Sequence, residues 1–270
     1  MIETLNIAVA GVAGRMGRQV IAGALDAGHR ITGGSEVPGS AQIGKDLGLL
    51  AGREAIGIAA KAGIGEAAEG ADVWVDFTAP QASLTALALA PTAGVKAVII
   101  GTTGFSAAQE DEIAKAAERM AIVKAGNFSL GVNLLQALVK QAAERLGEDW
   151  DIEILETHHR RKVDAPSGTA LMLGQAAADG RGRPLQDLRS EPYDGPDAKR
   201  EPGKIGFSVR RSGGVIGEHE VTFGSDMEVV SFSHTALDRA VFAHGAIKAA
   251  EWAVKQKPGL YGMDDVLGLT

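Results

Sequence analysis

Cysteine is absent from the 270 residues of this chain. Its absence excludes disulfides, thiolate metal sites and a cysteine nucleophile, and it fits a cytoplasmic protein in a reducing compartment. Long hydrophobic runs are also missing. The Ala-rich stretch 82–100 is interrupted by Pro91 and Lys96, so no membrane span is expected. No basic region precedes the first apolar run at the N-terminus, and we therefore expect no secretory signal.

Positive charge is in short supply as well. Lysine and arginine total 27 residues against 34 aspartates and glutamates, which gives a formal net charge of −7. A nucleic-acid or membrane-surface binder needs a broad basic face, so neither nucleic acid nor a membrane is expected as a partner. With 45% hydrophobic residues, the chain is long enough to form one large globular domain or two ordinary ones.

Short apolar runs alternate with helical patterns in the first half of the chain. The apolar runs predict buried strands at 5–11, 29–36, 71–77, 96–103 and 121–127. The helical patterns cover 14–28, 80–93 and 106–119. Such alternation is typical of βαβ units, and we expect an α/β fold with a parallel sheet.

The pattern changes after a helix predicted at 129–147. Further strands are predicted at 151–157, 205–211, 217–224 and 227–234, and the last two of them should form a hairpin. Helices are predicted at 167–179 and 238–256. Segment 183–204 is rich in proline, glycine and charge, which predicts a long surface loop. The two patterns indicate two domains, the second of α+β type, with a junction near residues 127–130.

A dinucleotide fingerprint is indicated between the first strand and the first helix. It runs from Gly11 to Gly17, and Glu36 ends the second strand at the distance expected for the acid of such a motif. Glycine lets the backbone approach a pyrophosphate, and the acid accepts hydrogen bonds from ribose hydroxyls. The middle glycine of the usual motif is replaced by Ala13, with Gly14 beside it. The glycines alone are therefore also compatible with simple chain turning and helix packing.

Three further segments fall at the predicted carboxyl ends of parallel strands, at 76–80, 101–104 and 125–128. Each of them alone is typical of an ordinary strand–helix turn. In an open α/β sheet, however, ligands bind beyond the carboxyl ends of the strands. Three such segments beside a fingerprint therefore predict a crevice for a dinucleotide cofactor.

The chain concentrates its cations at residues 158–162 (HHRRK), just before a helix that starts near Gly168 and Thr169. A charge run alone usually marks a solvated face, and paired histidines are more often structural than catalytic. Here the cations lie between a strand end and a helix N-terminus, whose amides suit a carboxylate, and lysine and histidine can deliver protons. The segment therefore predicts a receptor for a carboxylate-bearing substrate. The histidine spacing predicts no metal site.

Together these segments resemble the 4-hydroxy-tetrahydrodipicolinate reductase family, also called dihydrodipicolinate reductases, of the diaminopimelate route to lysine. The resemblance covers nearly the whole chain, and its most specific part is the string HHxxKxDAPSGTA at 158–170. The other segments that carry it are AGVAGRMGR (10–18), VDFT (75–78), IGTTGF (100–105), NFSLGVN (127–133), GEHEV (217–221) and DDVLGL (264–269).

The resemblance implies a Rossmann-type parallel-sheet dinucleotide domain formed by residues 1–128 and 237–270. It also implies an α+β domain with an open mixed sheet, residues 129–236, which would bind substrate and assemble the chain into a homotetramer. The implied reaction moves hydride from NAD(P)H to the dihydrodipicolinate ring, an unsaturated imine with two carboxylates, and gives tetrahydrodipicolinate. The expected small-molecule partner is therefore a dicarboxylate.

The functional residues of the family can be carried over where the motifs match. His158 is implied as the proton donor and Lys162 as the assisting donor. His159 and the amides of Gly168 and Thr169 are implied as substrate contacts. The implied cofactor contacts are Gly11, Val12, Ala13, Gly14, Arg15, Met16, Glu36, Gly101, Thr102, Thr103, Ala125, Gly126, Asn127 and Phe128.

Two positions depart from the pattern of some relatives. Val37 follows the acid where relatives that use the phosphorylated cofactor often carry arginine, and Ala79 also stands where some relatives have arginine. Without an arginine at position 37, Glu36 should repel a 2′-phosphate. We therefore expect NADH to be preferred and NADPH to be used less well. Arg15 and Lys45 are the cations that could soften this preference.

The residues leave two other hypotheses open. One is another Rossmann dehydrogenase of a small dicarboxylate, although a phosphorylating semialdehyde dehydrogenase would need a cysteine nucleophile. The other is a non-catalytic dinucleotide sensor, although such a regulator would want a DNA-binding helix pair or a basic surface. Oxidation of reduced nicotinamide with and without substrate discriminates between them.

Overall fold

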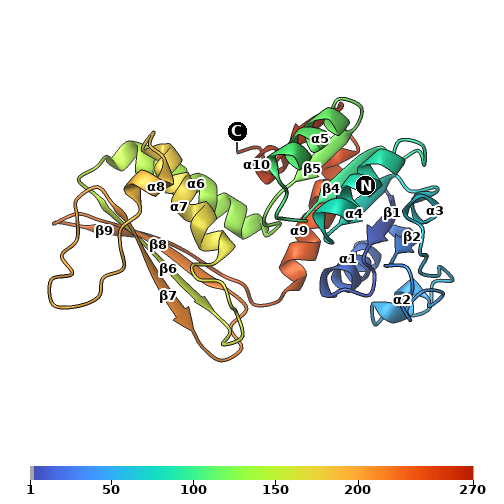
Figure 1. Cartoon of the computed structure of the whole chain (residues 1–270), viewed down its shortest axis with the longest axis horizontal. Helices are drawn as coiled ribbons and strands as arrows, with labels where there is room; N and C mark the ends of the chain where they lie inside the picture. Colours follow the sequence, from blue (N-terminus) through green and yellow to red (C-terminus); the bar gives the residue numbers. More distant parts are fainter. Residues whose placement is uncertain (1–2, 270) are drawn as a thin grey trace. The chain divides into compact units, whose positions relative to one another are not determined.

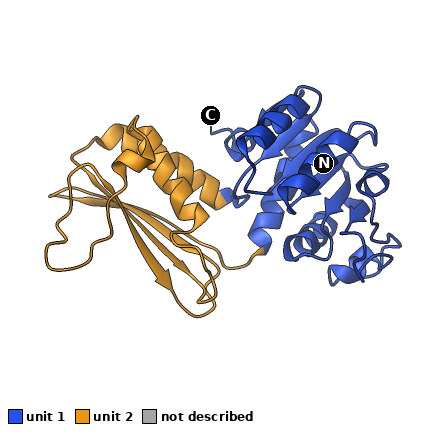
Figure 2. Cartoon of the chain, viewed as in Figure 1, with its two compact units in different colours: residues 1–130, 240–270 blue, residues 131–239 orange. Residues whose placement is uncertain are grey.

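The structure is a computed structural model that describes residues 3–269. It divides into two compact units (Figure 2). Unit 1 comprises Met1–Leu130 and Ala240–Thr270, and unit 2 comprises Gly131–Arg239. Unit 1 is therefore built from both ends of the chain, and unit 2 from the segment between them.

Unit 1 contains a six-stranded sheet in the order β10-β5-β4-β3-β1-β2 (Figure 1). Its strands are β1 (Asn6–Ala10), β2 (Arg30–Ser35), β3 (Val73–Asp76), β4 (Ala97–Ile100), β5 (Ala121–Lys124) and β10 (Gly259–Tyr261). Every pairing among these strands is parallel, which confirms the predicted parallel sheet. The strand order reverses between β1 and β3, so the sheet has its topological switch point there.

Helices cover both faces of this sheet, as Figure 1 shows. They are α1 (Arg15–Asp26), α2 (Leu47–Leu50), α3 (Ile64–Ala68), α4 (Pro80–Leu89), α5 (Ala107–Ala117), α9 (Ala240–Ala253) and α10 (Met263–Leu267). Ile7 and Val9 of β1 pack with residues of α1 and α9 on one face. Ala8 and Trp74 belong to a second core with residues of α4 and α5 on the other face. Burial on both faces explains why these strands are continuously apolar in the sequence.

Unit 2 is built on a four-stranded mixed sheet in the order β7-β6-β8-β9. Its strands are β6 (Asp151–His158), β7 (Ile205–Arg211), β8 (Glu218–Gly224) and β9 (Val229–Thr235). β6 pairs in parallel with β7 and antiparallel with β8, and β8 and β9 form the predicted hairpin. The expected second domain with an open mixed sheet is thus confirmed as a fold.

The helices of unit 2 are α6 (Leu130–Leu146), α7 (Gly168–Gly180) and the one-turn α8 (Leu185–Leu188). Leu135 of α6 and Leu173 of α7 share one core with Ile152 and Ile154 of β6, so both long helices pack on the same face of the sheet. On the opposite face, every second residue of β9 is exposed. This packing places the start of α7 beside the end of β6, where the predicted substrate residues lie.

Three segments contain more structure than the sequence predicts, and one of them is the segment after α9, which includes β10 and α10. The predicted loop 183–204 includes α8, whose Leu188 is buried. The weakly patterned region after β2 contains α2 and α3. There the Asp46 carboxylate accepts hydrogen bonds from the backbone amides of Ile56 and Gly57, at 3.1 and 2.7 Å. One-turn helices depend on such tertiary contacts and caps, so no periodic pattern in the sequence announces them.

Candidate active site

The carboxyl ends of the parallel strands of unit 1 lie along one edge of the sheet. The fingerprint turn follows β1, and Glu36 follows β2. The segments 77–79, 101–104 and 125–128 follow β3, β4 and β5. The structure therefore brings all predicted cofactor segments to the same edge, on both sides of the switch point. Ligands of open α/β sheets bind at this place.

Close packing explains two glycines of the fingerprint turn. Gly11 has a φ of 63°, and a Cβ there would lie only 2.8 Å from Thr78 Cγ2. Gly17 lies in α1, and a Cβ on it would lie 2.2 Å from the Gly11 carbonyl oxygen. The start of α1 can thus approach the turn after β1. The N-cap residue Gly14 provides no side-chain cap for the first amides of α1, as expected where a helix N-terminus faces a phosphate.

The Glu36 carboxylate is fixed beside this turn. Its Oε2 accepts a hydrogen bond from the Ala13 amide at 2.8 Å, and its Oε1 accepts one from the Val37 amide at 3.0 Å. Each oxygen keeps a further lone pair for a ribose hydroxyl. Val37 is 67% exposed and brings no charge to this place. The residues therefore fit the adenosine end of a dinucleotide.

A buried polar network joins the loops that follow β3 and β4. Asp76 is 1% exposed, and its Oδ1 accepts hydrogen bonds from the amide and the hydroxyl of Thr78, at 2.9 and 2.5 Å. The Thr102 hydroxyl accepts from the Thr78 amide at 2.9 Å and lies 3.0 Å from Ser83 Oγ. Asp76 and Thr78 belong to segment 76–80, which the sequence predicts as part of the cofactor crevice, but neither they nor Ser83 are predicted as individual contacts. Their network fixes two of the loops at the cofactor edge against each other.

The predicted cofactor residues differ in exposure at this edge. Val12 and Phe128 are buried in the core, and the Phe128 ring packs edge-on against Phe77 at 5.4 Å between centroids. Thr102 is buried in the polar network. The half-buried residues are Gly11, Ala13, Met16, Glu36, Gly101, Ala125 and Asn127, and the exposed ones are Gly14, Arg15, Thr103 and Gly126. Small residues and backbone thus make up most of the accessible edge.

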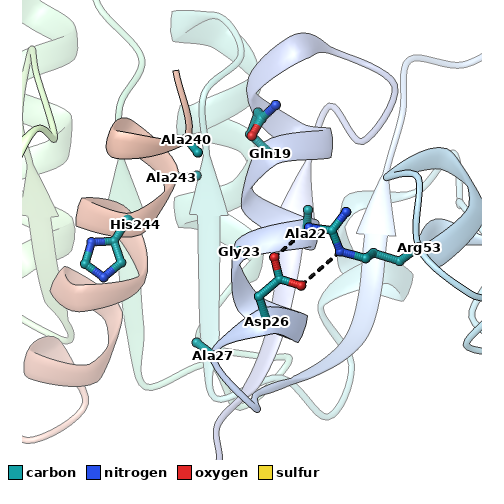
Figure 3. A pocket seen from close by; sticks show the side chains of 9 residues that line it. All are labelled: Gln19, Ala22, Gly23, Asp26, Ala27, Arg53, Ala240, Ala243 and His244. Carbon is teal, nitrogen blue, oxygen red and sulfur yellow. Dashed lines mark hydrogen bonds and ion pairs between the residues drawn. The ribbon is translucent and has the colours of Figure 1, made fainter. Parts of the chain in front are cut away.

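A separate cavity of about 370 Å³ lies between α1 and α9 in unit 1 (Figure 3). Small residues of both helices line it, and Figure 3 shows an ion pair between Arg53 and Asp26 at its side. The nine lining residues include none of the predicted site residues. Because its charged pair is already neutralised and exposed, the cavity gives no sign of a ligand of its own.

The candidate site of unit 2 is organised around Glu156, which is 1% exposed near the end of β6. Its Oε2 lies 2.6 Å from His158 Nδ1, and its Oε1 accepts a hydrogen bond from the Ser167 amide at 2.9 Å. Arg211, at the end of β7, donates to both oxygens, at 2.8 and 2.9 Å. One buried carboxylate thus holds a histidine, an arginine and the N-cap residue of α7.

The surroundings of Glu156 favour its ionised form. Burial alone would raise the pKa of this carboxyl, but hydrogen bonds from Arg211, His158 and Ser167 outweigh burial and hold the pKa below its usual value. Glu156 in turn raises the pKa of Arg211. Because an ionised carboxylate only accepts hydrogen bonds, His158 is the donor to it, through Nδ1.

His219 of β8 lies on the other side of His158. The two rings meet edge-on with their centroids 5.1 Å apart, and His219 Nε2 lies 3.2 Å from Ser167 Oγ. Burial, together with repulsion from His158, lowers the pKa of His219 to about 4. His219 is therefore a neutral ring near neutral pH and adds no charge to the site.

The other cations of the HHRRK run have different environments. Lys162 Nζ lies 2.9 Å from Asp164 Oδ2, and the hydrogen bond from this lysine lowers the pKa of Asp164. His159 is half-buried, and burial and the nearby Arg161 lower its pKa. Glu156 and Asp164 therefore balance part of the positive charge that the sequence predicts at this place.

Helix α7 begins directly after this segment. Ser167 is its N-cap residue, and the Ser167 hydroxyl accepts a hydrogen bond from the Ala170 amide at 3.2 Å. Gly168 is exposed, with open space where a Cβ would stand, and Thr169 is half-buried. The bond from the Ser167 amide to Glu156 ties the start of α7 to His158. A helix N-terminus, which is suited to an anion, and the His158 imidazole are thereby joined within unit 2.

Glu156, Arg211 and His219 are residues of this site that are not predicted from the sequence. Side chains of β6 alternate between the two faces of the sheet, and Glu156 lies on the buried face. A charged residue at an apolar position of this pattern is the sequence signal that could have pointed to Glu156. Arg211 and His219 enter the site through sheet register, because Arg211 pairs with His158 and His219 pairs with Glu156. Register of this kind is not visible in a single sequence.

No group of three or more histidine, cysteine, aspartate or glutamate residues within 3–269 is arranged to hold a metal ion. Over the same residues, no helix has the length and hydrophobicity needed to cross a membrane.

The fold and the two sites define an NAD(P)H-dependent oxidoreductase with a Rossmann-type domain. Two family models match this chain: "Dihydrodipicolinate reductase, N-terminus" over residues 5–128, and "Dihydrodipicolinate reductase, C-terminus" over residues 131–267. The chain therefore belongs to the dihydrodipicolinate reductase family.

Individual relatives agree with this assignment. The chain is 50% identical over 269 residues to the 4-hydroxy-tetrahydrodipicolinate reductase of Afipia carboxidovorans, covering 99% of this chain and 98% of the relative. It is 49% identical to the enzyme of the same name from Parvibaculum lavamentivorans, over the full length of both. A solved dipicolinate-bound dihydrodipicolinate reductase from Paenisporosarcina sp. TG-14 has the same fold, with a TM-score of 0.76 at 24% identity, over 97% of this chain and 99% of that one.

Proposed function

We propose that this chain reduces the dihydrodipicolinate ring, formed from 4-hydroxy-tetrahydrodipicolinate, to tetrahydrodipicolinate in the diaminopimelate route to lysine. The observation that carries the proposal is the buried Glu156–His158 pair tied to the N-terminus of α7 within the HHxxKxDAPSGTA segment. This arrangement offers an anion site and a proton donor together. The 50% identity to a full-length reductase of that name supports the same substrate.

In the proposed mechanism, the strand ends of unit 1 would hold NAD(P)H, which would supply the hydride for the ring. His158 then gives a proton to the ring, which quenches the negative charge that hydride addition leaves there. Lys162 assists as a second donor. A positioned general acid of this kind contributes about 10²–10⁴-fold to turnover.

The two carboxylates of the substrate need partners that carry or attract positive charge. The amides of Gly168 and Thr169 at the start of α7 donate to one of them, and His159 is a further substrate contact. Lys162 pairs with the other carboxylate. Lys162 now pairs with Asp164, whose side chain is 55% exposed. Because an ion pair at an exposed carboxylate is weak, Lys162 can exchange it for a substrate carboxylate.

The proposed cofactor contacts are the residues at the strand ends of unit 1, from Gly11 to Met16 with Glu36, Gly101 to Thr103 and Ala125 to Phe128. Glu36 accepts hydrogen bonds from the ribose hydroxyls of NADH. We propose that NADH is preferred and NADPH is usable but weaker, because Val37 offers no charge to a 2′-phosphate. The proposed location of the protein is the cytoplasm, where reduced nicotinamide is present for the reaction.

We also propose that unit 2 assembles the chain into a homotetramer. The face of β9 opposite the helices is exposed and includes Val229, 64% exposed, near Met227, 93% exposed. A second copy of the chain can cover such a face, and closed symmetric assembly is the common outcome. Light scattering at micromolar concentration measures the mass. A monomer there would contradict this part of the proposal.

The test of the function is an assay of NADH oxidation, followed through the absorbance of reduced nicotinamide. Oxidation that requires freshly made 4-hydroxy-tetrahydrodipicolinate, and that is lost in His158→Gln, would support the proposal. Faster oxidation with another small dicarboxylate would favour a different Rossmann dehydrogenase. Binding of NADH without oxidation in any mixture would favour a dinucleotide sensor.

A further inference from the structure

We propose that Glu156 and Gly217 together select Nε2 of His158 as the ring atom that exchanges a proton with the substrate. Glu156 occupies Nδ1, and Gly217 keeps the space in front of Nε2 clear. Glu156 is thus a positioning residue for His158, and Gly217 determines access to it. The inference rests on the proposed role of His158 as proton donor.

The Nδ1 side of the ring is held by a carboxylate that has little freedom to move. Oε2 of Glu156 lies 2.6 Å from Nδ1, and the His158 ring cannot be turned away without breaking this contact. Oε1 accepts a hydrogen bond from the Ser167 amide, and Arg211 donates to both oxygens. The carboxylate is buried and ionised, so it requires a proton on Nδ1.

The proton on Nδ1 leaves Nε2 as the atom that changes state. When the imidazolium of His158 gives its Nε2 proton to the ring of the substrate, the product is the neutral Nδ1–H tautomer. Glu156 stabilises the imidazolium through its charge and the neutral ring through the same hydrogen bond. A tautomer fixed by a carboxylate is a recognised way of making a histidine an efficient acid or base.

The Nε2 side of the ring faces Gly217. A Cβ at this position would lie 3.1 Å from His158 Nε2 and 3.5 Å from Cδ2. Gly217 is not among the glycines with positive φ, so its backbone conformation does not explain the glycine. No hydrogen bond of Nε2 occurs within the described residues, and the His158 side chain is 11% exposed. The missing side chain at 217 therefore leaves Nε2 open on this side.

The charged and titratable groups around His158 come from several elements. Glu156 belongs to its own strand, Arg211 comes from β7 and His219 from β8. Lys162 belongs to the loop before α7. Arg211 is already engaged with Glu156, and His219 is turned toward Ser167. Of these groups, the Glu156 carboxylate is the one in hydrogen-bond contact with the His158 ring.

The first test replaces Glu156 with glutamine, which keeps the shape but loses one acceptor. Arg211 donates to both positions, but the Ser167 amide is a fixed donor at the Oε1 position, so the remaining oxygen stays there and the new NH₂ group faces His158 Nδ1. It must donate there, and the ring changes to the Nε2–H tautomer. We expect kcat to fall about 10²-fold, within the range for losing a group that orients a histidine or ligand. The matched control is Glu153→Gln, which lies on the same strand and pairs with Arg200 instead.

The readout is the tautomer of His158 in ¹⁵N magic-angle-spinning spectra of histidine-labelled protein, on the alkaline side of the histidine titration. The His158 signals are assigned by their loss in His158→Gln. We expect Nδ1–H in the wild type and in Glu153→Gln, and Nε2–H in Glu156→Gln. A wild-type ring already protonated at Nε2, or no change of tautomer in Glu156→Gln, would overturn the proposal. If the Glu156–His158 pair only stabilised the fold, its loss would lower stability without changing the tautomer.

The second test is Gly217→Ala, which places a methyl group against Nε2 and leaves the Glu156 contact intact. We expect kcat to fall about tenfold, with the KM for NADH and the His158 tautomer unchanged. Gly214→Ala in the same loop is the control, because a Cβ there meets nothing within 4 Å. Wild-type kcat in Gly217→Ala would refute the role of this glycine. Since the spectra need no substrate, they report on the tautomer even if the proposed reaction itself fails.

Discussion

The two candidate sites of this chain differ in the groups that form them. At the cofactor edge of unit 1, glycines, backbone amides and neutral hydroxyls predominate, and Glu36 is the half-buried acid beside the fingerprint turn. In unit 2, the site is a compact cluster of ionised and titratable groups around Glu156. The first arrangement suits a ligand that approaches the backbone closely, and the second suits a ligand bound through charge and protons.

This difference separates the expected effects of substitutions. Changes in unit 1 should alter cofactor affinity through shape or through a single charge. Changes in unit 2 should alter turnover, the pH dependence of stability, or both. A variant in one site that affected the readout of the other would break the comparison.

The largest effect is expected for His158→Gln. Loss of the proposed general acid should lower kcat by about 10²–10⁴-fold, because glutamine has a similar size but cannot deliver a proton. The KM for NADH should hardly change, because His158 lies outside the cofactor edge of unit 1. Steady-state kinetics with both substrates varied checks this. Turnover at the wild-type level in a folded variant would remove His158 from the mechanism.

The contrast between the units also explains how much the sequence could predict. Long elements such as β6 and α7 are predicted within about a residue because periodic burial is encoded locally. The three-residue β10 and the one-turn α8 are missed, because they exist through contacts with distant segments. The location of the cofactor segments at one edge of the sheet is predictable, because the carboxyl ends of parallel strands lie at the same edge.

The cluster in unit 2 was predictable only in part. The run from His158 to Lys162 stands out in the sequence, and so does the helix start at Ser167. The groups that hold His158 are missed because they lie far away in the chain or are hidden in a strand. Arg211 reaches Glu156 only through the pairing of β6 with β7, and single-sequence patterns contain no information about this register.

The next prediction concerns the pH dependence of stability in unit 2. The pKa of His219 is lowered from 6.5 to about 4 in the folded chain. Between these values the unfolded chain binds a proton that the folded chain does not. The free energy of unfolding therefore falls as the pH is lowered from 6.5, because protonation of the buried His219 is unfavourable in the folded chain. The loss is complete once the pH has passed through about 4. Its full size is about 3 kcal/mol from the linkage between pKa and stability.

The measurement is the free energy of unfolding against pH for the wild type and for His219→Gln. Trp150 can report on unit 2 if the other two of the three tryptophans are replaced by phenylalanine. The variant should lose less stability than the wild type between pH 6.5 and 4. The exposed His244→Gln serves as the control and should follow the wild type. Identical curves for all three proteins would show that burial of His219 carries no such cost.

A smaller effect is expected for Gly17→Ala in unit 1. The new Cβ would lie 2.2 Å from the Gly11 carbonyl oxygen, so the start of α1 must move away from the turn. Overpacking of this kind costs about 1–3 kcal/mol, and the displaced turn should raise the Kd for NADH about tenfold. Gly28→Ala is a poor control because its φ is positive, whereas Gly23→Ala in the same helix has its nearest contact at 3.8 Å. Calorimetric titration with NADH should show normal affinity for Gly23→Ala and weak binding for Gly17→Ala.

The smallest effect is expected for the choice between NADH and NADPH, where Glu36 acts by its charge. Two like unit charges about 4 Å apart repel by roughly 1 kcal/mol in water and roughly 4 kcal/mol at an effective dielectric near 20. Even the lower value, reduced by screening, predicts a several-fold preference for NADH in kcat/KM. Val37→Arg should reverse or remove it, because arginine pairs with the 2′-phosphate and also neutralises Glu36. Both cofactors are compared at one salt concentration. Equal or better use of NADPH by the wild type would mean that another cation, such as Arg15 or Lys45, already pairs with the phosphate. Substitution of that cation should then restore the preference for NADH.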